Sequence, residues 1–236
     1  MSDLVVAVVP AAGQGARMGR HTPKQYLTLG EVPILVYCLK VFQQVSDIDS
    51  IVLSVPESDR DFCRHDIVLA HHLTKVSCIV AGGRRRQDSV RHGIMSLTTP
   101  PALILVHDGV RPFIDERMVR EVIQAARRTG AAVAAMPLHD TVKRVGPDHL
   151  IRETLNREEL WQTQTPQAFQ FDWLVEGHRL AQEQGWEVTD DAAIIERLGY
   201  PVSVVEGSCF NIKITRPEDL VLGEAIRQAS TKQGLL

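Results

Sequence analysis

The sequence predicts an α/β fold with a doubly wound, mainly parallel sheet. Short apolar runs bounded by Gly, Pro or Asp alternate along the chain with segments whose apolar residues recur at helical spacing. The runs are continuous, as in strands that are buried on both faces. The 236 residues, 44% hydrophobic and 23% charged, suit one such domain with a full core. Ligands are then expected outside the carboxyl ends of the strands.

Six apolar runs are expected to be strands. They are residues 4–10, 50–56, 75–83, 102–109, 131–138 and 201–207. Two helices between them have recognisable ends. The segment 33–45 is apolar at helical spacing, and Pro33 suits its first turn. In the segment 115–130, Asp115 can cap the start and Gly130 can end the helix.

The alternation ends after residue 137, which divides the expected domain into a body and an arm. Residues 138–160 are expected to form a β-hairpin around a Gly-Pro turn, and it has too few apolar residues to be a core element. Helices are expected in 171–185 and 189–199, and a last helix where Thr215 and Glu218 have capping-box spacing. Residues 1–236 therefore form one domain, with a projecting arm.

Composition excludes several classes of protein. A net charge of −3 argues against a general nucleic-acid-binding surface, and no stretch approaches the length of a membrane span. The four cysteines are scattered without a C-x-x-C pair, and no histidines have metal-binding spacing. Asp3 stands where a secretory signal would be basic. We therefore expect a cytoplasmic protein with no protein-held metal site.

The opening loop, "PAAGQGARMGRHTPKQYL", differs from both common glycine-rich phosphate loops. It has no glycine at position 18, where the dinucleotide fingerprint needs one, and no Gly-Lys-Ser/Thr of a Walker A loop. Arg17, Arg20 and Lys24 follow its glycines, with no acid between Asp3 and Glu31. Three cations in an otherwise acidic protein favour a polyanionic ligand. The alternative is a plain strand-to-helix turn with solvated basic residues.

Two further segments support a phosphate-containing ligand. Gly82 and Gly83 follow a strand and precede a helix, so their backbone can approach a base or a phosphate. The run 84–86 of three arginines usually indicates a solvated face, although cations at a helix start favour a nearby anion. Asp108 and Arg111 end a core strand, where a carboxylate can orient a ribose or Mg²⁺, or only cap a turn. No serine lies in a nucleophile elbow, so covalent catalysis is not expected.

The opening motif "PAAGxGxRMG…PKQ" resembles the signature of nucleotidyltransferases that join a nucleoside monophosphate to a phosphorylated sugar or polyol. "GGxxRQDSV", "HDGVRP", "DTVKR", "NREELWQTQTPQ", "TDD" and "NIKITRPEDL" follow in order. Together these motifs resemble the 2-C-methyl-D-erythritol 4-phosphate cytidylyltransferase family of the non-mevalonate isoprenoid pathway, over residues 5–222. The resemblance implies a Rossmann-like nucleotidyltransferase fold and a homodimer in which the hairpin arm exchanges between subunits. One departure is "DGVRP", where many members have "DAARP".

The resemblance also implies site residues. The CTP-binding residues would be Ala11, Ala12, Gly13, Gly15, Gly82, Gly83, Ser89, Asp108 and Gly109. The catalytic residues would be Arg17, Lys24, Arg157 and Lys213. The residues that position the methylerythritol phosphate would be Arg111, Thr141, Arg157, Thr189 and Lys213. Through the exchanged arm, Arg157 would reach the neighbouring chain's site.

The implied reaction needs no general base, because the attacking phosphate monoester is already mostly ionised at pH 7. Mg²⁺ is expected to be held mainly by the CTP phosphates, because the chain lacks a tight carboxylate cluster. Two alternatives stay open at this point. A ribitol 5-phosphate cytidylyltransferase is one, although its relatives tend to have "AGG" at residues 11–13. The other is a nicotinamide-dependent oxidoreductase or a non-catalytic nucleotide sensor.

Overall fold

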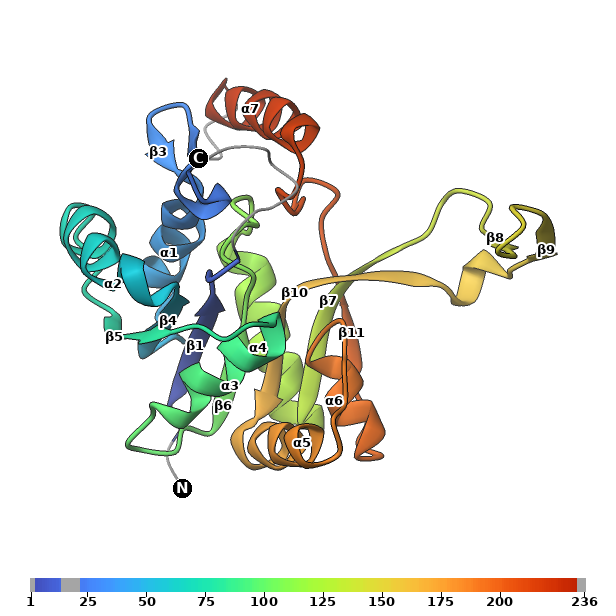
Figure 1. Ribbon diagram of the computed structural model, residues 1–236, viewed down its shortest axis with the longest axis horizontal. Coiled ribbons are helices and arrows are strands. Elements are labelled where there is room, and N and C mark those ends of the chain that lie inside the picture. Colours follow the sequence, from blue (N-terminus) through green and yellow to red (C-terminus); the bar gives the residue numbers. More distant parts are fainter. Residues whose placement is uncertain (1–2, 14–21, 233–236) are drawn as a thin grey trace.

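The computed structural model describes residues 3–13 and 22–232. Its main element is a seven-stranded sheet in the order β11-β7-β10-β6-β1-β4-β5, in which only β10 is antiparallel to its neighbours (Figure 1). The strands are β1 (Val5–Pro10), β4 (Ser50–Val55), β5 (Val76–Ala81), β6 (Leu103–Val106), β7 (Ala131–Pro137), β10 (Trp161–Gln170) and β11 (Ser203–Glu206). The expected mainly parallel sheet is confirmed.

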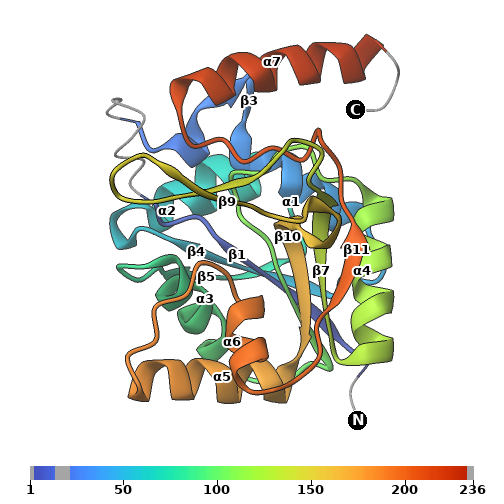
Figure 2. The same cartoon turned by 90° about the vertical axis from the view of Figure 1, so that its right-hand side faces the viewer.

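Helices cover both faces of this sheet (Figure 2). Side chains of β1 alternate between two apolar clusters, Val5, Ala7 and Val9 in one and Val6 and Val8 in the other. The first cluster includes residues of α1 (Ile34–Gln44) and α4 (Glu116–Thr129). The second includes residues of α3 (Arg86–Met95), α5 (Phe171–Glu183) and α6 (Ala192–Arg197). A central strand buried on both sides explains why its sequence is continuously apolar.

Helix α4 has the ends that its sequence predicts. The side chain of Asp115 accepts a hydrogen bond of 2.7 Å from the backbone of Met118, which stabilises the helix by about 1 kcal/mol. Gly130 ends the helix at φ 91°, and its N–H donates to the carbonyl of Ala126. A Cβ at residue 130 would lie 2.2 Å from Trp173. Both the backbone angle and the lack of space therefore require glycine there.

Strand β10 was not predicted, because its sequence lacks an apolar run. It begins "WQTQTPQ", yet the stretch from Gln164 to Phe169 is buried. The amides of Gln164 and Gln167 are tolerated in the interior because both are hydrogen-bonded. Its register with β7 shifts between Thr163 and Gln167, and this irregularity re-aims side chains near the cavity described below.

The last helix, α7 (Pro217–Lys232), starts with a different cap from the predicted one. The carboxylate of Asp219, not of Glu218, accepts from the backbone N–H groups of Thr215 and Arg216 at 2.7 and 2.8 Å. The acid therefore lies four residues after Thr215, one position later than the capping-box spacing. α7 packs above the body (Figure 1), where Ile226 joins an apolar cluster that includes Leu29 and Ile34 as well as loop residues.

Short elements complete the chain. A 3₁₀ turn (Lys24–Tyr26) and a small hairpin of β2 (Thr28–Leu29) and β3 (Val32–Pro33) precede α1; a 3₁₀ turn (Glu57–Asp59), α2 (Arg60–Phe62) and a π-helix (Cys63–Leu69) precede β5. After β7 the chain leaves the body and forms a hairpin of β8 (Lys143–Val145) and β9 (Ile151–Thr154), and returns through a 3₁₀ turn (Arg157–Glu159) to β10. This hairpin extends far from the sheet, and its strand residues are exposed (Figure 1).

Candidate active site

A cavity of about 390 Å³ lies where β1 ends, and the residues that follow β1 line it. Of its described lining residues, five are cations and one is an acid. The cations are Lys24, Arg84, Arg85, Arg86 and Lys213, and the acid is Asp108. The surplus of positive charge favours a polyanionic ligand in a protein whose net charge is −3.

Glycines allow the backbone segments around this cavity to pack closely. A Cβ at Gly82 would lie 2.1 Å from the Cβ of Ala12, so the two backbones can approach only because residue 82 is glycine. A Cβ at Gly109 would similarly lie 3.1 Å from Ala11 and 2.8 Å from Leu35. Next to them, the N–H of Gly83 donates to Ser89 Oγ at 3.0 Å, which fixes the turn before α3. Gly82 and Gly109 thus pack behind the residues that line the cavity.

A second cavity of about 380 Å³ adjoins the first. The two share Arg86, Asp108 and Lys213, so these residues form their common boundary. The other lining residues are mostly hydrogen-bonding ones from β10 and from the segment before α6: Arg111, Thr163, Gln164, Thr165, Gln167, Thr189, Asp190, Ala193 and Glu196. Such a lining suits a small ligand that is rich in hydroxyl or phosphate oxygens.

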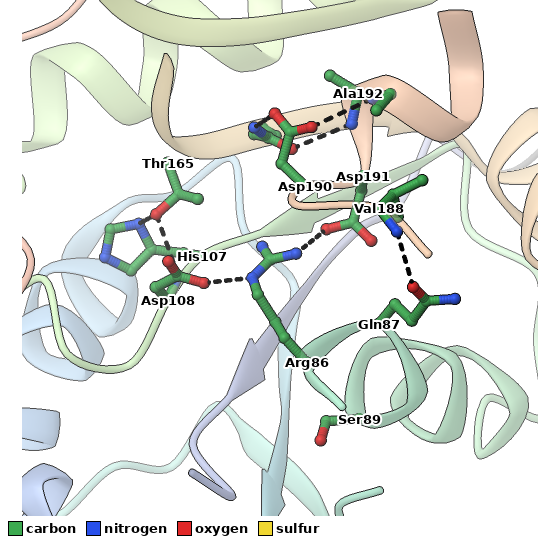
Figure 3. Close-up of polar contacts among 12 residues, drawn as sticks. Arg86, Gln87, Ser89, His107, Asp108, Thr165, Val188, Asp190, Asp191 and Ala192 are labelled. Atoms are coloured by element: carbon green, nitrogen blue, oxygen red, sulfur yellow. Dashed lines mark hydrogen bonds and ion pairs between the residues drawn. The ribbon is translucent and has the colours of Figure 1, made fainter. Parts of the chain in front are cut away.

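Asp108 is the acid at this boundary, and each of its oxygens accepts from a different cation. Arg86 Nε lies 2.6 Å from one oxygen, and Lys213 Nζ lies 2.7 Å from the other. Figure 3 shows Arg86 between Asp108 and a second carboxylate, Asp191, at 2.6 Å from Nη1. Burial alone would raise the pKa of Asp108, but Arg86 and Lys213 hold it far below its ordinary range. Asp108 is therefore ionised at neutral pH.

A buried hydrogen-bonded line holds the turn that carries Asp108 (Figure 3). The N–H of Asp108 and His107 Nδ1 both lie 3.1 Å from Thr165 Oγ1, and His107 Nε2 lies 3.1 Å from the carbonyl of Arg111. A carbonyl can only accept, so Nε2 carries the proton and Thr165 donates to Nδ1. Burial lowers the pKa of His107 to about 4, and the ring is neutral at pH 7. It therefore positions the turn without adding charge.

Lys213 and Lys24 reach the cavity from separate segments. The backbone N–H of Ile214 donates to the carbonyl of Val110 at 2.9 Å, which ties the segment before α7 to the turn after Asp108. Ile214 is completely buried beneath α7, so Lys213 is directed from a fixed backbone. Lys24 begins a 3₁₀ turn whose next two residues are buried. Both amines are therefore presented from anchored positions.

Comparisons with known proteins identify the family of this chain. The family model described as "IspD: 2-C-methyl-D-erythritol 4-phosphate cytidylyltransferase" matches residues 5–229. A 2-C-methyl-D-erythritol 4-phosphate cytidylyltransferase from Syntrophus aciditrophicus (strain SB) is 50% identical over 225 residues, 95% of this chain and 96% of that protein. The chain belongs to this family. It is therefore a cytidylyltransferase, which excludes the nicotinamide-dependent oxidoreductase and the nucleotide sensor.

Further cytidylyltransferases agree in sequence and in structure. The enzyme of the same name from Pelotomaculum thermopropionicum is 44% identical over 99% of this chain and 98% of its own length. The crystal structure of 4-diphosphocytidyl-2C-methyl-D-erythritol synthase from Anaerococcus prevotii is similar with a TM-score of 0.85, at 32% identity over 96% of each chain. The resemblance that the motifs indicated is confirmed over nearly the whole chain.

The structure brings most of the predicted cytidylyltransferase residues to the two cavities. Residues from four separate segments line the first: Ala11, Ala12, Gly13, Lys24, Gly83, Ser89, Asp108 and Lys213. Arg111 and Thr189 line the second, together with Asp108 and Lys213. Arg111 Nη1 also donates to the carbonyl of Asn211 at 2.6 Å. Gly15 and Arg17 lie outside the described residues.

Four of the described predicted residues line neither cavity of their own chain: Gly82 and Gly109, which pack behind the lining, and Thr141 and Arg157. Thr141 and Arg157 belong to the arm and are exposed. Arg157 donates to the carbonyl of His139, also on the arm. Neither of them lines a cavity.

Sequence reasoning missed the role of Arg86. The run 84–86 was expected to be a solvated face, but the Arg86 side chain is only 22% exposed and is bound by two buried carboxylates. Asp191, within "TDD", and His178, in α5, were not predicted to matter either. The one signal in the sequence that Arg86 binds an acid was the run of cations at the start of a helix, where the helix dipole disfavours them.

The described part of the chain offers no separate metal site. Among these residues, no three His, Cys, Asp or Glu side chains are grouped so that they could hold a metal ion. Nor does any helix within the described ranges have the length and apolar character that crossing a bilayer requires.

Proposed function

We propose that this cytidylyltransferase transfers CMP from CTP to 2-C-methyl-D-erythritol 4-phosphate and releases pyrophosphate. The product is 4-diphosphocytidyl-2-C-methyl-D-erythritol. Family membership supports this acceptor over ribitol 5-phosphate. The observation that carries the proposal is the pair of adjoining cavities that share Arg86, Asp108 and Lys213. One cavity suits a nucleoside triphosphate and the other a polyol phosphate.

CTP is assigned to the first cavity, for reasons of charge and space. Its triphosphate would lie against Lys24, Lys213 and the backbone that follows β1, where cations outnumber acids. Cytosine would lie near Gly83 and Ser89, whose hydrogen bond defines the turn before α3. Arg17 belongs with Lys24 in the proposed catalytic set.

The acceptor is assigned to the second cavity. Arg111 and Lys213 supply positive charge for its phosphate, and Thr189 supplies a hydroxyl. The pKa of Arg111 is lowered by burial, which indicates a guanidinium that benefits from an anion nearby. The acceptor phosphate then approaches CTP across the boundary that Asp108 and Lys213 form.

The transfer is proposed to be a direct in-line displacement. An oxygen of the acceptor phosphate forms a bond to the α-phosphorus of CTP, and the bond from that phosphorus to the oxygen bridging to the β-phosphate breaks. Pyrophosphate departs with the electron pair. The nucleophile is already ionised, since its second pKa is about 6. The chain therefore contributes positioning and fixed positive charge, mainly from Arg17, Lys24 and Lys213.

Mg²⁺ is the proposed metal, held mainly by the CTP phosphates. Asp108 is the single carboxylate among the described residues that line the first cavity, and both its oxygens accept from cations. This donor set fits an ion whose ligands come chiefly from the nucleotide and water. When bound, Mg²⁺ neutralises phosphate charge and orients the triphosphate.

A pyrophosphate-release assay with a matrix of substrates tests this function. CTP and ATP are each combined with methylerythritol phosphate or ribitol 5-phosphate, with and without Mg²⁺, and products are identified by mass. Release is expected only with CTP, methylerythritol phosphate and Mg²⁺. Preferred release with ribitol 5-phosphate would contradict the proposed acceptor, and the absence of release with any pair would contradict the activity.

A homodimer through the arm (residues 138–160) is also proposed, because Thr141 and Arg157 are exposed there and line neither cavity of their own chain. Mixing two inactive variants tests it. Arg157→Ala and Lys213→Ala proteins are mixed and allowed to exchange subunits. If the arm serves the neighbouring site, random exchange restores about a quarter of the wild-type sites. No recovery of activity in verified heterodimers would contradict the proposed dimer.

A cytoplasmic location, expected from the scattered cysteines, stays a prediction.

A further inference from the structure

A line of polar side chains in close contact runs from the interior to the boundary of the two cavities. His178 Nε2 lies 3.2 Å from Asp191, and Asp191 lies 2.6 Å from Arg86 Nη1. Arg86 Nε lies 2.6 Å from Asp108, which lies 2.7 Å from Lys213 Nζ. Figure 3 shows the central part of this line, with Arg86 between the two carboxylates. The line starts at α5 and ends at the proposed site of transfer.

The inner residues of the line cannot touch a substrate. Asp191 is 0% exposed and His178 is 3% exposed, and neither lines a cavity. Arg86 reaches the boundary, but its third nitrogen, Nη2, is shielded from solvent and has no hydrogen-bond partner among the described residues. Arg86 therefore links the buried carboxylate of Asp191 to the boundary of the two cavities.

Stability alone does not account for this arrangement. A buried ion pair is weak evidence for stability, because apolar side chains of similar size often stabilise as well or better. Arg86 also begins α3, where the helix dipole disfavours a cation. Two carboxylates from distant segments are directed at it nonetheless, and one of them, Asp108, borders both cavities.

The neighbours of Arg86 attach the same segment to α3. Gln87 Nε2 donates to the carbonyl of Trp186 at 2.9 Å. Its Oε1 accepts from the N–H of Val188 at 3.2 Å, as Figure 3 shows. The segment that carries Thr189 and Asp191 is thus fixed to the first turn of α3. Gln87 fixes the backbone, and Arg86 contacts both Asp191 of this segment and Asp108.

We propose that Asp191 is a positioning residue for the transfer reaction: it fixes Arg86 against Asp108 and thereby sets the positions of Asp108 and Lys213 at the boundary of the two cavities. This inference rests on the proposed function. Asp191 binds Nη1 of the Arg86 guanidinium, so Nε is directed at a single oxygen of Asp108. The second oxygen is then left to orient Lys213.

A double-mutant cycle tests the proposal, with wild type, Asp191→Asn, Arg86→Gln and the double variant. Pyrophosphate release gives kcat and KM for each substrate, and CTP titration without acceptor gives the fraction of molecules that bind. Asp191→Asn is expected to lower kcat per binding-competent molecule by about 10-fold or more, with the Kd for CTP within about 3-fold of wild type. The double variant is expected to have a kcat within about 3-fold of Arg86→Gln, because Asp191 acts through Arg86.

The control is Glu187→Gln, in the same segment. Glu187 is 82% exposed and meets Arg85 at 3.4 Å, so its removal is expected to change kcat by less than about 2-fold. A purely structural role for Asp191 would lower the melting temperature and the binding fraction but leave kcat per competent molecule unchanged. That result would overturn the proposal, as would additive effects in the cycle or an equal loss in Glu187→Gln.

Two failures remain distinguishable. If wild type releases no pyrophosphate with the proposed pair, the proposed function is wrong; if wild type does and Asp191→Asn equals it, only the positioning role is wrong. If Asp191→Asn does not fold, Arg86→Gln and the double variant decide, since both lack the buried guanidinium. A further fall of more than about 3-fold in the double variant would then overturn the proposal.

Discussion

Asp108→Asn is the most informative single change, because it removes one negative charge from between two cations and keeps the size of the side chain. The amide can accept from one of Arg86 and Lys213, while its NH₂ group faces the other. One cation then meets a donor where it had an acceptor, at a spacing of 2.6–2.7 Å. We expect both the stability of the fold and the rate of transfer to fall.

The loss of stability can be estimated from exposure. Breaking a buried ion pair by removing one partner costs about 3–5 kcal/mol. Arg86 keeps Asp191, so we take about half of that, about 2 kcal/mol. The Lys213 side chain is 37% exposed, and such a pair contributes about 0.2–1 kcal/mol. The free energy of unfolding should thus fall by about 2–3 kcal/mol, which corresponds to a melting temperature about 4–12 °C lower.

Urea denaturation at pH 7.5 without substrates measures the first effect, and pyrophosphate release at saturating CTP and acceptor measures the second. We expect kcat to fall by about 100-fold, since Lys213 loses the oxygen that orients it. Glu57→Gln is the control: its pair with Arg60 is exposed, so stability should change by less than about 1 kcal/mol. Asp108→Asn with wild-type stability and kcat would refute the account of the boundary.

Three further outcomes are expected. Lys24→Ala should lower kcat by about 100-fold or more in the pyrophosphate assay, and near-wild-type turnover would contradict a transition-state role. Gly82→Ala should cost about 1–3 kcal/mol in urea denaturation and weaken CTP binding, because its Cβ would lie 2.1 Å from that of Ala12. Gly13→Ala, whose Cβ meets only an ordinary contact, is the matched control for stability alone, because Gly13 lines the CTP cavity. Burial lowers the pKa of His107 to about 4 from 6.5, so the native state binds fewer protons than the unfolded state between these values. The free energy of unfolding should therefore fall by up to about 3 kcal/mol as the pH is lowered from 6.5 to 4, and His107→Gln should remove this slope.

The sequence predicted the parallel strands because burial on both faces leaves a continuous apolar run. The ends of α4 were predictable because Asp115 and Gly130 act through local geometry. Strand β10 was not, because its buried residues include Gln164 and Gln167, whose amides are satisfied by partners far away in the chain. Where tertiary hydrogen bonds replace apolar burial, a local pattern carries no signal.

The residues of the candidate site likewise include some that the sequence predicted and some that it did not. Residues in glycine-rich or strand-end motifs, such as Gly83 and Asp108, were predictable because the motif itself sets their backbone. Arg86 was not, since its importance comes from Asp191, which lies 105 positions later. From the sequence alone it was one of three similar arginines. The structure separates them: Arg85 pairs with exposed Glu187 and with Asp88, and Arg86 with two buried carboxylates.

Among the described residues that line the first cavity, the placement of one acid among five cations also bears on how the site binds two polyanions. Asp108 engages both Arg86 and Lys213, but the two cations differ in exposure, 22% against 37%. Arg86 is held from behind by Asp191 and cannot follow a substrate. Lys213 has no second carboxylate among its described ion pairs, and it borders both cavities. Under the proposed transfer, we expect Lys213 to turn from Asp108 to the transferred group, while Arg86 stays paired with Asp108. Asp108 thus holds Lys213 at the boundary, and its own charge repels the substrate phosphates little because Arg86 neutralises it.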